Sequence, residues 1–358
     1  MLGAMNDGAV VLANDLLRDM HGKTAHGLIR GPSRWPIVAA VDASCAGSDA
    51  GEAVDGKARG VPVFGSVSEA LESTEPTPGV CVIGVATSGG RIPPAIRVDL
   101  MAAARAGLTL VGGLHQLLGD DVELAELVRQ AGGDIIDLRR PRPTSELRFW
   151  DGECLSVRGM RVAVLGTDCA IGKRTTCQLL LEALRASEVK ADMVYTGQTG
   201  WMQGLRHGFI LDATPNDFVP GELERAIIAC AGDTDPDVIL LEGQSALRNP
   251  SGPCGAELIS STGARGVILQ HAPGRRTFQG MEQLGIEIPS LEEELELIKL
   301  LGAEVWAITL HDEGMSAEQL AEVRDQLEAR FEIPVLRPLV DNLRSLARFI
   351  RNKLEEAS

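Results

Sequence analysis

The sequence is poor in aromatic residues, which make up 3% of its 358 residues and include a single tyrosine. So little aromatic surface leaves few platforms on which single-stranded bases could stack. An excess of basic residues is also missing, because 34 Lys and Arg stand against 50 Asp and Glu, for a net charge of −16. This charge repels polyanions at long range, so we expect neither a nucleic acid nor a membrane surface as partner. A small-molecule substrate remains possible, and an anionic one needs a local basic pocket.

Long apolar runs are absent as well. No stretch approaches the roughly 18 uninterrupted apolar residues that a membrane helix needs. The apolar run within residues 1–23 is too short and too interrupted by acids for a signal peptide. The seven cysteines show no CxxC and no metal-ligand spacing, so we interpret them as reduced thiols that mostly pack as small hydrophobic groups. These absences predict a cytoplasmic protein without a bound metal.

The chain does contain an alternation of short apolar runs with helical patterns. In the first part, strands are expected at residues 24–30, 36–42, 61–65, 79–87, 109–114 and 134–138, and helices at 66–73, 93–107 and 120–132. Such alternation is typical of a parallel α/β sheet. No GxGxxG follows a strand in this Rossmann-like domain, predicted to span residues 1–145, so a scaffold that shapes one wall of a cleft explains it at least as well as NAD binding.

A second α/β series follows a Pro- and Arg-rich connection at residues 139–159. Strands are expected at residues 160–166, 191–197, 237–243, 266–272, 304–310 and 333–339, and helices at 174–188, 220–232, 289–302, 316–331 and 341–358. The sequence therefore predicts an α/β protein in which the N-terminal Rossmann-like domain precedes a P-loop NTPase-like domain, residues 146–358, with a mostly parallel sheet.

The segment GTDCAIGKRTT, residues 166–176, joins a predicted strand to a predicted helix, which is the setting of a phosphate-binding loop. Glycines allow the backbone to approach an anion, the helix N-terminus favours negative charge, and Lys173 adds a cation. The residues expected to bind the cofactor are Gly166, Thr167, Cys169, Ala170, Ile171, Gly172, Lys173, Arg174, Thr175 and Thr176.

This loop departs twice from the usual G-x-x-x-x-G-K-[ST] pattern. Five residues separate its glycines, and Arg174 takes the place of the hydroxyl that holds Mg²⁺. The five-residue spacing resembles the loop of dethiobiotin synthetase, a family that keeps a threonine after the lysine. Either Thr175 shifts into that role, or the phosphates are bound without being transferred, as the pyrophosphate of coenzyme A would be. Asp168 could fix the loop through backbone amides or face an acceptor amine.

Polar side chains at other strand ends supply the remaining candidates for a site. Glu242 is a candidate base, with a helix cap or an ion-pair partner as the plainer alternative. His271 is the natural base near neutral pH, or a structural hydrogen-bonding residue. Arg275, next to Arg276, suits a carboxylate, although a solvated surface pair is equally simple. The predicted catalytic residues are Glu242, His271 and Asp168.

A glycine-spaced loop, YTGQTGWMQG, follows the strand at residues 191–197 and offers groups that can hydrogen-bond an amino acid or cover a pantetheine arm. Trp201 in this loop is explained equally well by packing. Asp217 could accept a substrate ammonium or cap the following helix. The residues predicted to contact the substrate are Tyr195, Gln198, Thr199, Gln203, Asp217, Gln244 and Arg275.

Five motifs in chain order, GTDCAIGKRTT, YTGQTGWMQG, NDFVPGELE, LLEGQSALRNPSG and LQHAPGRR, resemble the D-glutamate N-acetyltransferase (DgcN-like) family, formerly a domain-of-unknown-function family with a deviant P-loop. The resemblance covers nearly the whole chain. It implies an acetyl-CoA-dependent N-acetyltransferase of D-amino-acid catabolism that acts on D-glutamate, and a homo-oligomer, expected to be a dimer. It assigns no catalytic base.

Three other classes of function remain open at this point. The first is an ATP- and Mg-dependent ligase or kinase of the dethiobiotin-synthetase type, against which Arg174 argues. The second is a sensor that binds coenzyme A or a nucleotide without catalysis. The third is an NAD oxidoreductase, which the missing GxGxxG disfavours.

Overall fold

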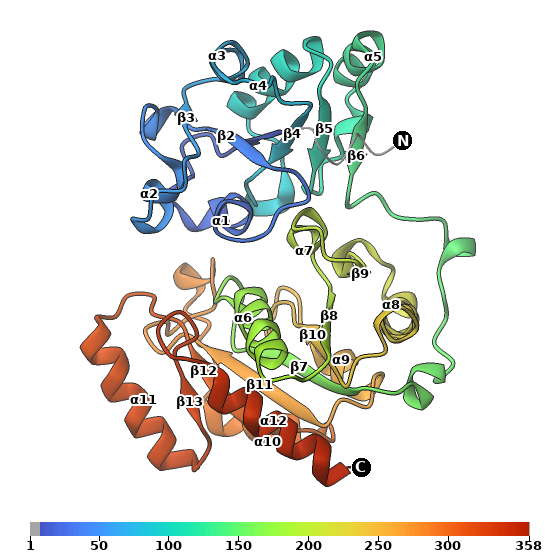
Figure 1. Ribbon diagram of the computed structural model, residues 1–358, viewed down its shortest axis with the longest axis vertical. Coiled ribbons are helices and arrows are strands. Elements are labelled where there is room, and N and C mark those ends of the chain that lie inside the picture. The colour runs from blue at the N-terminus through green and yellow to red at the C-terminus, as the bar shows by residue number, and fades with distance from the viewer. Residues whose placement is uncertain (1–7, 358) are drawn as a thin grey trace. The chain divides into compact units, whose positions relative to one another are not determined.

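The computed structural model describes residues 8–357 and divides the chain into two compact units (Figure 1). Unit 1 contains the residues up to 141 together with residues 198–205, and unit 2 contains residues 142–197 and those from 206 onward. The first seven residues of the N-terminal stretch judged too short for a signal peptide lie outside the described part. None of the described helices is both long and apolar enough to cross a membrane.

Unit 1 is built on a six-stranded parallel sheet with the order β3-β2-β1-β4-β5-β6. Its strands are β1 (Ala9–Leu12), β2 (Ile37–Val41), β3 (Val63–Phe64), β4 (Val80–Ile83), β5 (Thr109–Gly112) and β6 (Ile135–Asp137). The helices α3 (Val67–Ser73), α4 (Pro94–Arg105) and α5 (Val122–Ala131) share one core with the sheet, and α1 (Lys23–Arg30) and α2 (Ala50–Asp55) share the core on its other face. This is the predicted Rossmann-like arrangement.

The prediction of a strand at residues 24–30 is wrong, because these residues form helix α1. Its buried residues include Ala25, Leu28 and Ile29, and their spacing of three and four places them on one face of a helix. The first strand is instead β1, a run of four fully buried residues in the middle of the sheet.

The segment that links β8 (Ala191–Tyr195) to β9 (His207–Gly208) leaves unit 2 and packs in unit 1 as the short helix α7 (Gln198–Met202). Met202 is fully buried in the same core as Val111 of β5, on the face that carries α1 and α2. A Cβ added to Gly113 would lie 2.7 Å from Gln198 Cγ, so a glycine is needed where α7 approaches the end of β5. Segment 198–205 therefore completes one face of the unit 1 sheet.

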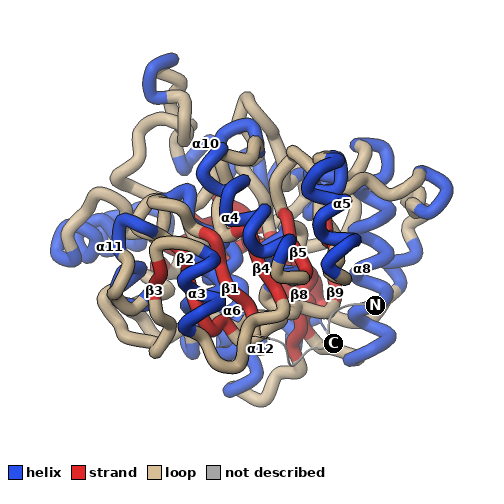
Figure 2. The backbone as a smooth tube through the Cα atoms, turned by 90° about the horizontal axis from the view of Figure 1, so that it is seen from above, coloured by secondary structure: helices blue, strands red, loops and turns tan. Residues whose placement is uncertain are grey.

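Unit 2 contains a seven-stranded parallel sheet with the order β13-β12-β11-β7-β10-β8-β9. Its other strands are β7 (Met160–Gly166), β10 (Val238–Glu242), β11 (Gly266–His271), β12 (Glu304–Leu310) and β13 (Val335–Leu336). Helices α8 (Val219–Thr234), α9 (Ala256–Ser260), α10 (Leu291–Leu300) and α11 (Ala317–Phe331) pack in one core, while α6 (Lys173–Ala186) contacts β7, β10 and α12 (Arg344–Ala357). Figure 2 shows strands enclosed by helices, which confirms the predicted α/β class.

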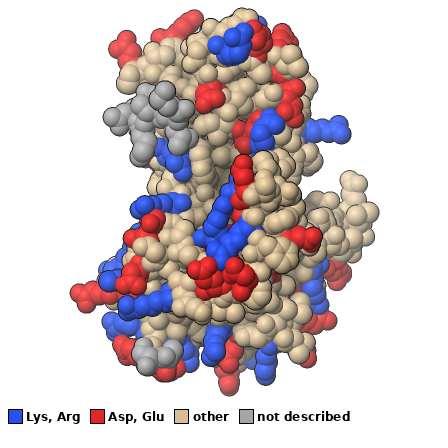
Figure 3. Space-filling model, turned by 90° about the vertical axis from the view of Figure 1, so that its right-hand side faces the viewer, with Lys and Arg blue, Asp and Glu red and all other residues tan. Residues whose placement is uncertain are grey.

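Charged side chains of both signs are interspersed on the molecular face shown in Figure 3. Many charged side chains of the described residues form ion pairs. Arg97, for example, is paired with Asp121 at 3.0 Å and with Glu123 at 2.7 Å. The acidic excess of the sequence is therefore accompanied by local pairing of charges.

Candidate functional site

Three loops meet at the carboxyl edge of the unit 2 sheet. Strand β7 pairs in parallel with β10 on one side and with β11 on the other, so the loops that follow these strands emerge side by side. Open α/β sheets place their ligand sites at this edge. We therefore take these loops as the candidate site.

The loop between β7 and α6, residues 167–172, is wound so that backbone amides remain available for a ligand. Its φ angles are +55° at Ala170 and +95° at Gly172, and left-handed residues in such turns aim neighbouring amides into an anion-binding concavity. The amides of Ala170, Ile171 and Gly172 donate no hydrogen bond to another described residue. Helix α6 adds the partial positive charge of its N-terminus. The loop fits a phosphate group.

Lys173 links this loop to the next one. Its Nζ donates to the carbonyl oxygen of Asp168 at 2.6 Å and to that of Ser245 at 2.8 Å, and the residue is 7% exposed. Ser245 follows β10, so the two bonds hold the positive charge of Lys173 between the loops after β7 and β10.

Asp168 anchors the loop from within. Its carboxylate is fully buried and accepts hydrogen bonds from the amides of Cys169 at 2.7 Å and Gln279 at 2.8 Å. It also accepts from the Asn249 side chain at 3.3 Å and from Arg275 Nη1 at 2.7 Å. Four donors thus engage the oxygens of Asp168, and its catalytic role stays a prediction. The other predicted role, fixing the loop, agrees with these contacts.

Arg275 is equally occupied. Its Nη1 also donates to the carbonyl of Cys169 at 2.8 Å, and its Nη2 is ion-paired with Glu313. Its guanidinium is thus engaged within the protein, and the binding of a substrate carboxylate by Arg275 stays a prediction. Arg276, by contrast, has a side chain that is 84% exposed and pairs with Glu287 at 2.6 Å. A ligand can reach Arg276.

Thr176 is turned toward the core of the sheet. Its hydroxyl donates to Gln270 Oε1 at 2.6 Å, which also accepts from the Thr309 hydroxyl at 2.6 Å. Both Thr176 and Gln270 are buried. The Thr176 hydroxyl is thus engaged within the protein, and cofactor binding by Thr175 and Thr176 stays a prediction.

Arg174 and Glu242 carry opposite charges that act on each other; Glu242 is 3% exposed, whereas Arg174 is half-buried. Glu242 ends β10 and accepts a hydrogen bond from the amide of Thr196 at 3.1 Å. Burial raises the pKa of Glu242 above its ordinary value, and the positive charge of Arg174 opposes this rise. Burial lowers the pKa of Arg174, and the charge of Glu242 opposes that change. The Nε of Arg174 is buried with no hydrogen-bond partner in the described part of the chain.

These two positions are informative because P-loop enzymes hold Mg²⁺ between the hydroxyl after the lysine and an acidic residue of a neighbouring strand. Here a guanidinium follows Lys173 and interacts with the strand-end carboxylate. At the position after Lys173 the chain thus has a positive charge of its own, that of Arg174.

His271 ends β11 and borders the same loop. Its Nδ1 lies 3.0 Å from the Thr167 hydroxyl. Burial lowers the pKa of His271 to about 4, so its ring is neutral at pH 7 and can accept a proton.

Three further residues predicted to bind substrate belong to unit 2. Gln244 follows β10 and donates from Nε2 to the Thr196 hydroxyl at 3.1 Å. Tyr195 ends β8 and is 5% exposed. Asp217 is exposed in a short 3-10 helix, Asn216–Phe218, and the N-cap of α8 is Phe218 rather than Asp217. Tyr195 and Gln244 thus lie at or just beyond strand ends, and Asp217 does not cap α8.

The other three predicted substrate residues lie in α7 or directly after it, within unit 1. The Thr199 hydroxyl is 3.3 Å from that of Thr24, and Gln203 Nε2 donates to the carbonyl of Gly27 at 2.8 Å. Gln198 is 9% exposed. Thr199 and Gln203 thus help to dock the segment on α1, and the contact of these three residues with substrate stays a prediction.

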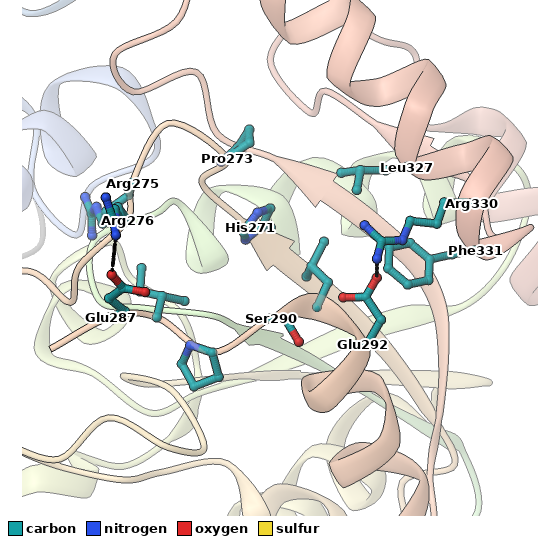
Figure 4. A pocket seen from close by; sticks show the side chains of 13 residues that line it. His271, Pro273, Arg275, Arg276, Glu287, Ser290, Glu292, Leu327, Arg330 and Phe331 are labelled. Atoms are coloured by element: carbon teal, nitrogen blue, oxygen red, sulfur yellow. Dashed lines mark hydrogen bonds and ion pairs between the residues drawn. The ribbon is translucent and has the colours of Figure 1, made fainter.

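A surface pocket of about 320 Å³ opens beside His271 (Figure 4). Its wall includes Arg276 and the α11 residues Arg330 and Phe331. Arg330 is ion-paired with Glu292, as Arg276 is with Glu287. The pocket volume lies in the range that small-molecule sites occupy.

The sequence analysis missed several members of this site. Asn249, Gln279 and Glu313 contribute to the contacts around Asp168 and Arg275 from three different loops. They lie 81 to 145 residues beyond Asp168 in the sequence, so no local spacing could have revealed them. Asn249 does lie in the LLEGQSALRNPSG motif, and this position was the available signal.

Two family models match the chain. One, described as the Domain of unknown function (DUF1611_C) P-loop domain, matches residues 148–347, and the other, the DUF1611_N Rossmann-like domain, matches residues 43–141. A crystal structure of a DUF1611 family protein from Anabaena variabilis superimposes with a TM-score of 0.87 at 29% identity, covering 97% of this chain and all of that one.

Two curated proteins named D-glutamate N-acetyltransferase are also similar to the chain. The one from a Pseudoalteromonas species is 29% identical over 272 residues, which cover 74% of this chain and 79% of that protein. The one from Tritonibacter scottomollicae is 29% identical over 265 residues, which cover 72% and 76%.

Proposed function

Since the chain belongs to the DUF1611 family, we propose that it is an acyltransferase that moves the acetyl group of acetyl-CoA to the amine of an acidic amino acid, with D-glutamate as the first candidate. The names of the two curated relatives support this activity. The observation that carries the proposal is Arg174, which follows Lys173 and whose charge interacts with that of Glu242. It argues for phosphates that are held without the magnesium of phosphoryl transfer.

In this proposal the protein binds coenzyme A by its phosphates, which take no part in the reaction. The amides of residues 170–172 and Lys173 stabilise the pyrophosphate, and the pantetheine arm turns back along the strand ends to bring the thioester to Glu242 and His271. The amine attacks the thioester carbonyl, the carbon–sulfur bond breaks, and coenzyme A leaves as a thiol. The ammonium of the acceptor must first lose a proton, which requires a base.

Glu242 and His271 are the two candidates for that base. Burial raises the pKa of Glu242 above that of an ordinary carboxyl, which makes it a stronger base when it is ionised, and the positive charges of Arg174 and Lys173 oppose this rise. His271 is neutral because burial holds its pKa at about 4, which makes it a weaker base that is ready to accept at any pH near neutrality. We favour Glu242.

For the carboxylates of the acceptor we propose the pocket beside His271. Arg276 and Arg330 line it, and an incoming carboxylate can replace Glu287 or Glu292 as the partner of these arginines. Arg276 thus takes the place that the sequence analysis gave to Arg275.

The test is a thiol-release assay with acetyl-CoA across D- and L-amino acids, with and without EDTA. We expect release with D-glutamate, little release with L-glutamate, and no effect of EDTA. Absence of release, together with Mg²⁺-dependent ATP hydrolysis, would contradict the proposal and favour a ligase or kinase.

A further inference from the structure

A second cluster of chemically reactive side chains lies in unit 2, outside the candidate site. Among the described residues, one ligand atom from each of Asp192, His207 and Cys230 lies within 4.8 Å of the other two. They come from β8, β9 and α8. A carboxylate, an imidazole and a thiol are all ligands that Zn²⁺ takes in proteins.

The pairing of the strands explains why these side chains meet. His207 is the parallel partner of Val194, and Asp192 lies two residues before Val194 on the same face of β8. Val194 packs in the core that also contains Cys230 of α8. The three ligands therefore face one another between the edge of the sheet and the helix.

His207 supplies an independent sign of a missing ligand. It is 4% exposed, and its Nε2 is buried with no hydrogen-bond partner among the residues described. Asp233 Oδ2 lies 3.6 Å from this nitrogen, beyond hydrogen-bond length, and is held at 3.0 Å by Arg206. A buried imidazole nitrogen without a partner is costly, and a metal ion would satisfy it.

The surroundings also prepare Asp192 for coordination. Its Oδ1 accepts from the amide of Met193 at 2.8 Å and lies 3.6 Å from Arg185, and its Oδ2 accepts from the Thr234 hydroxyl at 3.2 Å. Such outer contacts orient a ligating carboxylate. Asp233 is near enough to His207 to serve as a fourth ligand after a small rotation of its side chain.

From this arrangement we propose that unit 2 binds one Zn²⁺ ion through Asp192, His207 and Cys230, with Asp233 or a water molecule in the fourth position. Asp192 lies near the start of β8, whereas the candidate functional site lies at the strand ends, so the ion has a structural role. It holds β8, β9 and α8 together, and His207 lies next to the point where the segment carrying α7 re-enters unit 2. The proposal does not depend on the proposed acetyl transfer.

The sequence analysis expected no metal because it searched for local ligand spacing. The three ligands are separated by 15 and 23 residues, and β9 is only two residues long. Only the fold brings them together.

The test begins with the full chain, purified without a histidine tag and stripped of metal by a chelator. Titration with Zn²⁺ against a chromophoric competitor is expected to give one site per chain with a submicromolar dissociation constant. Replacement of Zn²⁺ by Co²⁺ should add a thiolate-to-cobalt charge-transfer band, which reports a Co–S bond directly. Binding no tighter than that of the variants below, or a cobalt spectrum without this band, would overturn the proposal.

Two variants and one matched control assign the ligands. His207→Asn and Cys230→Ser should each weaken Zn²⁺ binding roughly 100-fold or more, since each removes one ligand. Cys154→Ser is the control, because Cys154 is an equally buried thiol of the same unit, and it should bind Zn²⁺ like the parent. Loss of binding in Cys154→Ser but not in Cys230→Ser would refute the assignment. Circular dichroism of the metal-free proteins checks folding.

The pH dependence of Zn²⁺ binding is measured on the parent protein, so this test remains valid even if a variant fails to fold. Zn²⁺ binds cysteine as the thiolate, so binding releases the proton of the Cys230 thiol. The affinity of the parent protein should then rise roughly tenfold per pH unit between pH 7 and pH 8.5. An affinity that does not change with pH would exclude Cys230 as a ligand.

Discussion

At the scale of single residues, Arg174 occupies a position where P-loop enzymes need a hydroxyl for magnesium. Its Nε is buried and has no hydrogen-bond partner among the described residues, and the charge of Glu242 acts on its guanidinium. If Arg174 replaces the metal, Arg174→Thr should create a magnesium site. We expect Mg-ATP to raise the melting temperature of this variant by roughly 4 °C or more and to leave the parent unchanged.

The matched control is Arg174→Lys, which keeps the positive charge. It should show no response to Mg-ATP and should retain more acetyl transfer than Arg174→Thr. A parent protein that is itself stabilised by Mg-ATP would speak against the replacement of the metal by Arg174.

Lys173 should act on the carrier rather than on the acceptor. We expect Lys173→Ala to raise the KM for acetyl-CoA roughly tenfold or more, because a charged hydrogen bond contributes about 1.5–3 kcal/mol. The KM for the amine should change little. Steady-state kinetics with each substrate varied in turn measures both values, and Lys190→Ala, at an exposed lysine of the same unit, is the control. Equal effects on both substrates would contradict the binding of coenzyme A by its phosphates.

With Glu242 as the base, kcat should depend on pH in a particular way. A base must be ionised to accept a proton, and burial raises the pKa of Glu242 above 4.5. The kcat should therefore fall as pH drops through this raised pKa, and Glu242→Gln should lose this limb together with roughly 100-fold or more of kcat. The measurement is a pH profile of kcat for both proteins. A limb that persists in Glu242→Gln and disappears in His271→Gln would transfer the role to His271.

At the scale of elements, the ion pair between Asp168 and Arg275 fixes the loop after β7 to the loop after β11. Both side chains are nearly inaccessible, 0% and 7% exposed, so breaking the pair leaves a buried charge. We expect Asp168→Asn to lower the free energy of unfolding by about 3 kcal/mol. Urea unfolding followed by circular dichroism measures this loss.

The neighbouring arginine provides the control for this prediction. Arg276 forms an ion pair of the same chemistry with Glu287, but both side chains are largely exposed. Arg276→Ala should change the free energy of unfolding by less than about 1 kcal/mol. Similar losses in Asp168→Asn and Arg276→Ala would mean that burial does not govern the strength of the loop anchor.

Most elements could be predicted from the sequence because their apolar residues repeat with the period of the element. The strand at 160–166 and the helix after Gly172 are examples. The error at residues 24–30 arose where a short segment contains apolar residues compatible with either period, and tertiary packing decided for the helix. Strand β1 was missed because four residues carry too little pattern.

The site was predictable to the extent that strand ends converge. Lys173, Glu242 and His271 were found because each follows or ends a buried strand. The ion pair between Asp168 and Arg275 spans 107 residues of sequence and could not be predicted. Their charges identify them as polar, but only the fold shows that they neutralise each other.

At the scale of the whole molecule, unit 1 depends on residues from the second half of the chain. Trp201 stacks edge-on against Trp35 with ring centres 5.9 Å apart, and Arg34 lies 4.1 Å above the Trp201 ring. A fragment of residues 1–141 lacks these contacts. We expect it to melt at a lower temperature than the same region in the full chain, and a synthetic peptide of residues 196–207 to raise that temperature.

The control is the same peptide with Trp201→Ala, which removes the stacking and should stabilise the fragment far less. Differential scanning fluorimetry measures all three samples. A fragment whose melting temperature is unchanged by either peptide would show that segment 198–205 contributes nothing to the stability of unit 1.

The insertion of segment 198–205 also sets an order for synthesis on the ribosome. Unit 1 cannot be completed when residue 141 emerges, because the 64 residues from 142 to 205 must still be made. At roughly 5–20 residues per second, this delay lasts roughly 3–13 s. During this interval the apolar surface around Val111 and Ile136, later covered by Met202, is open to water and to chaperones. The N-terminal half of the nascent chain is therefore the part most exposed to aggregation, although it is translated first.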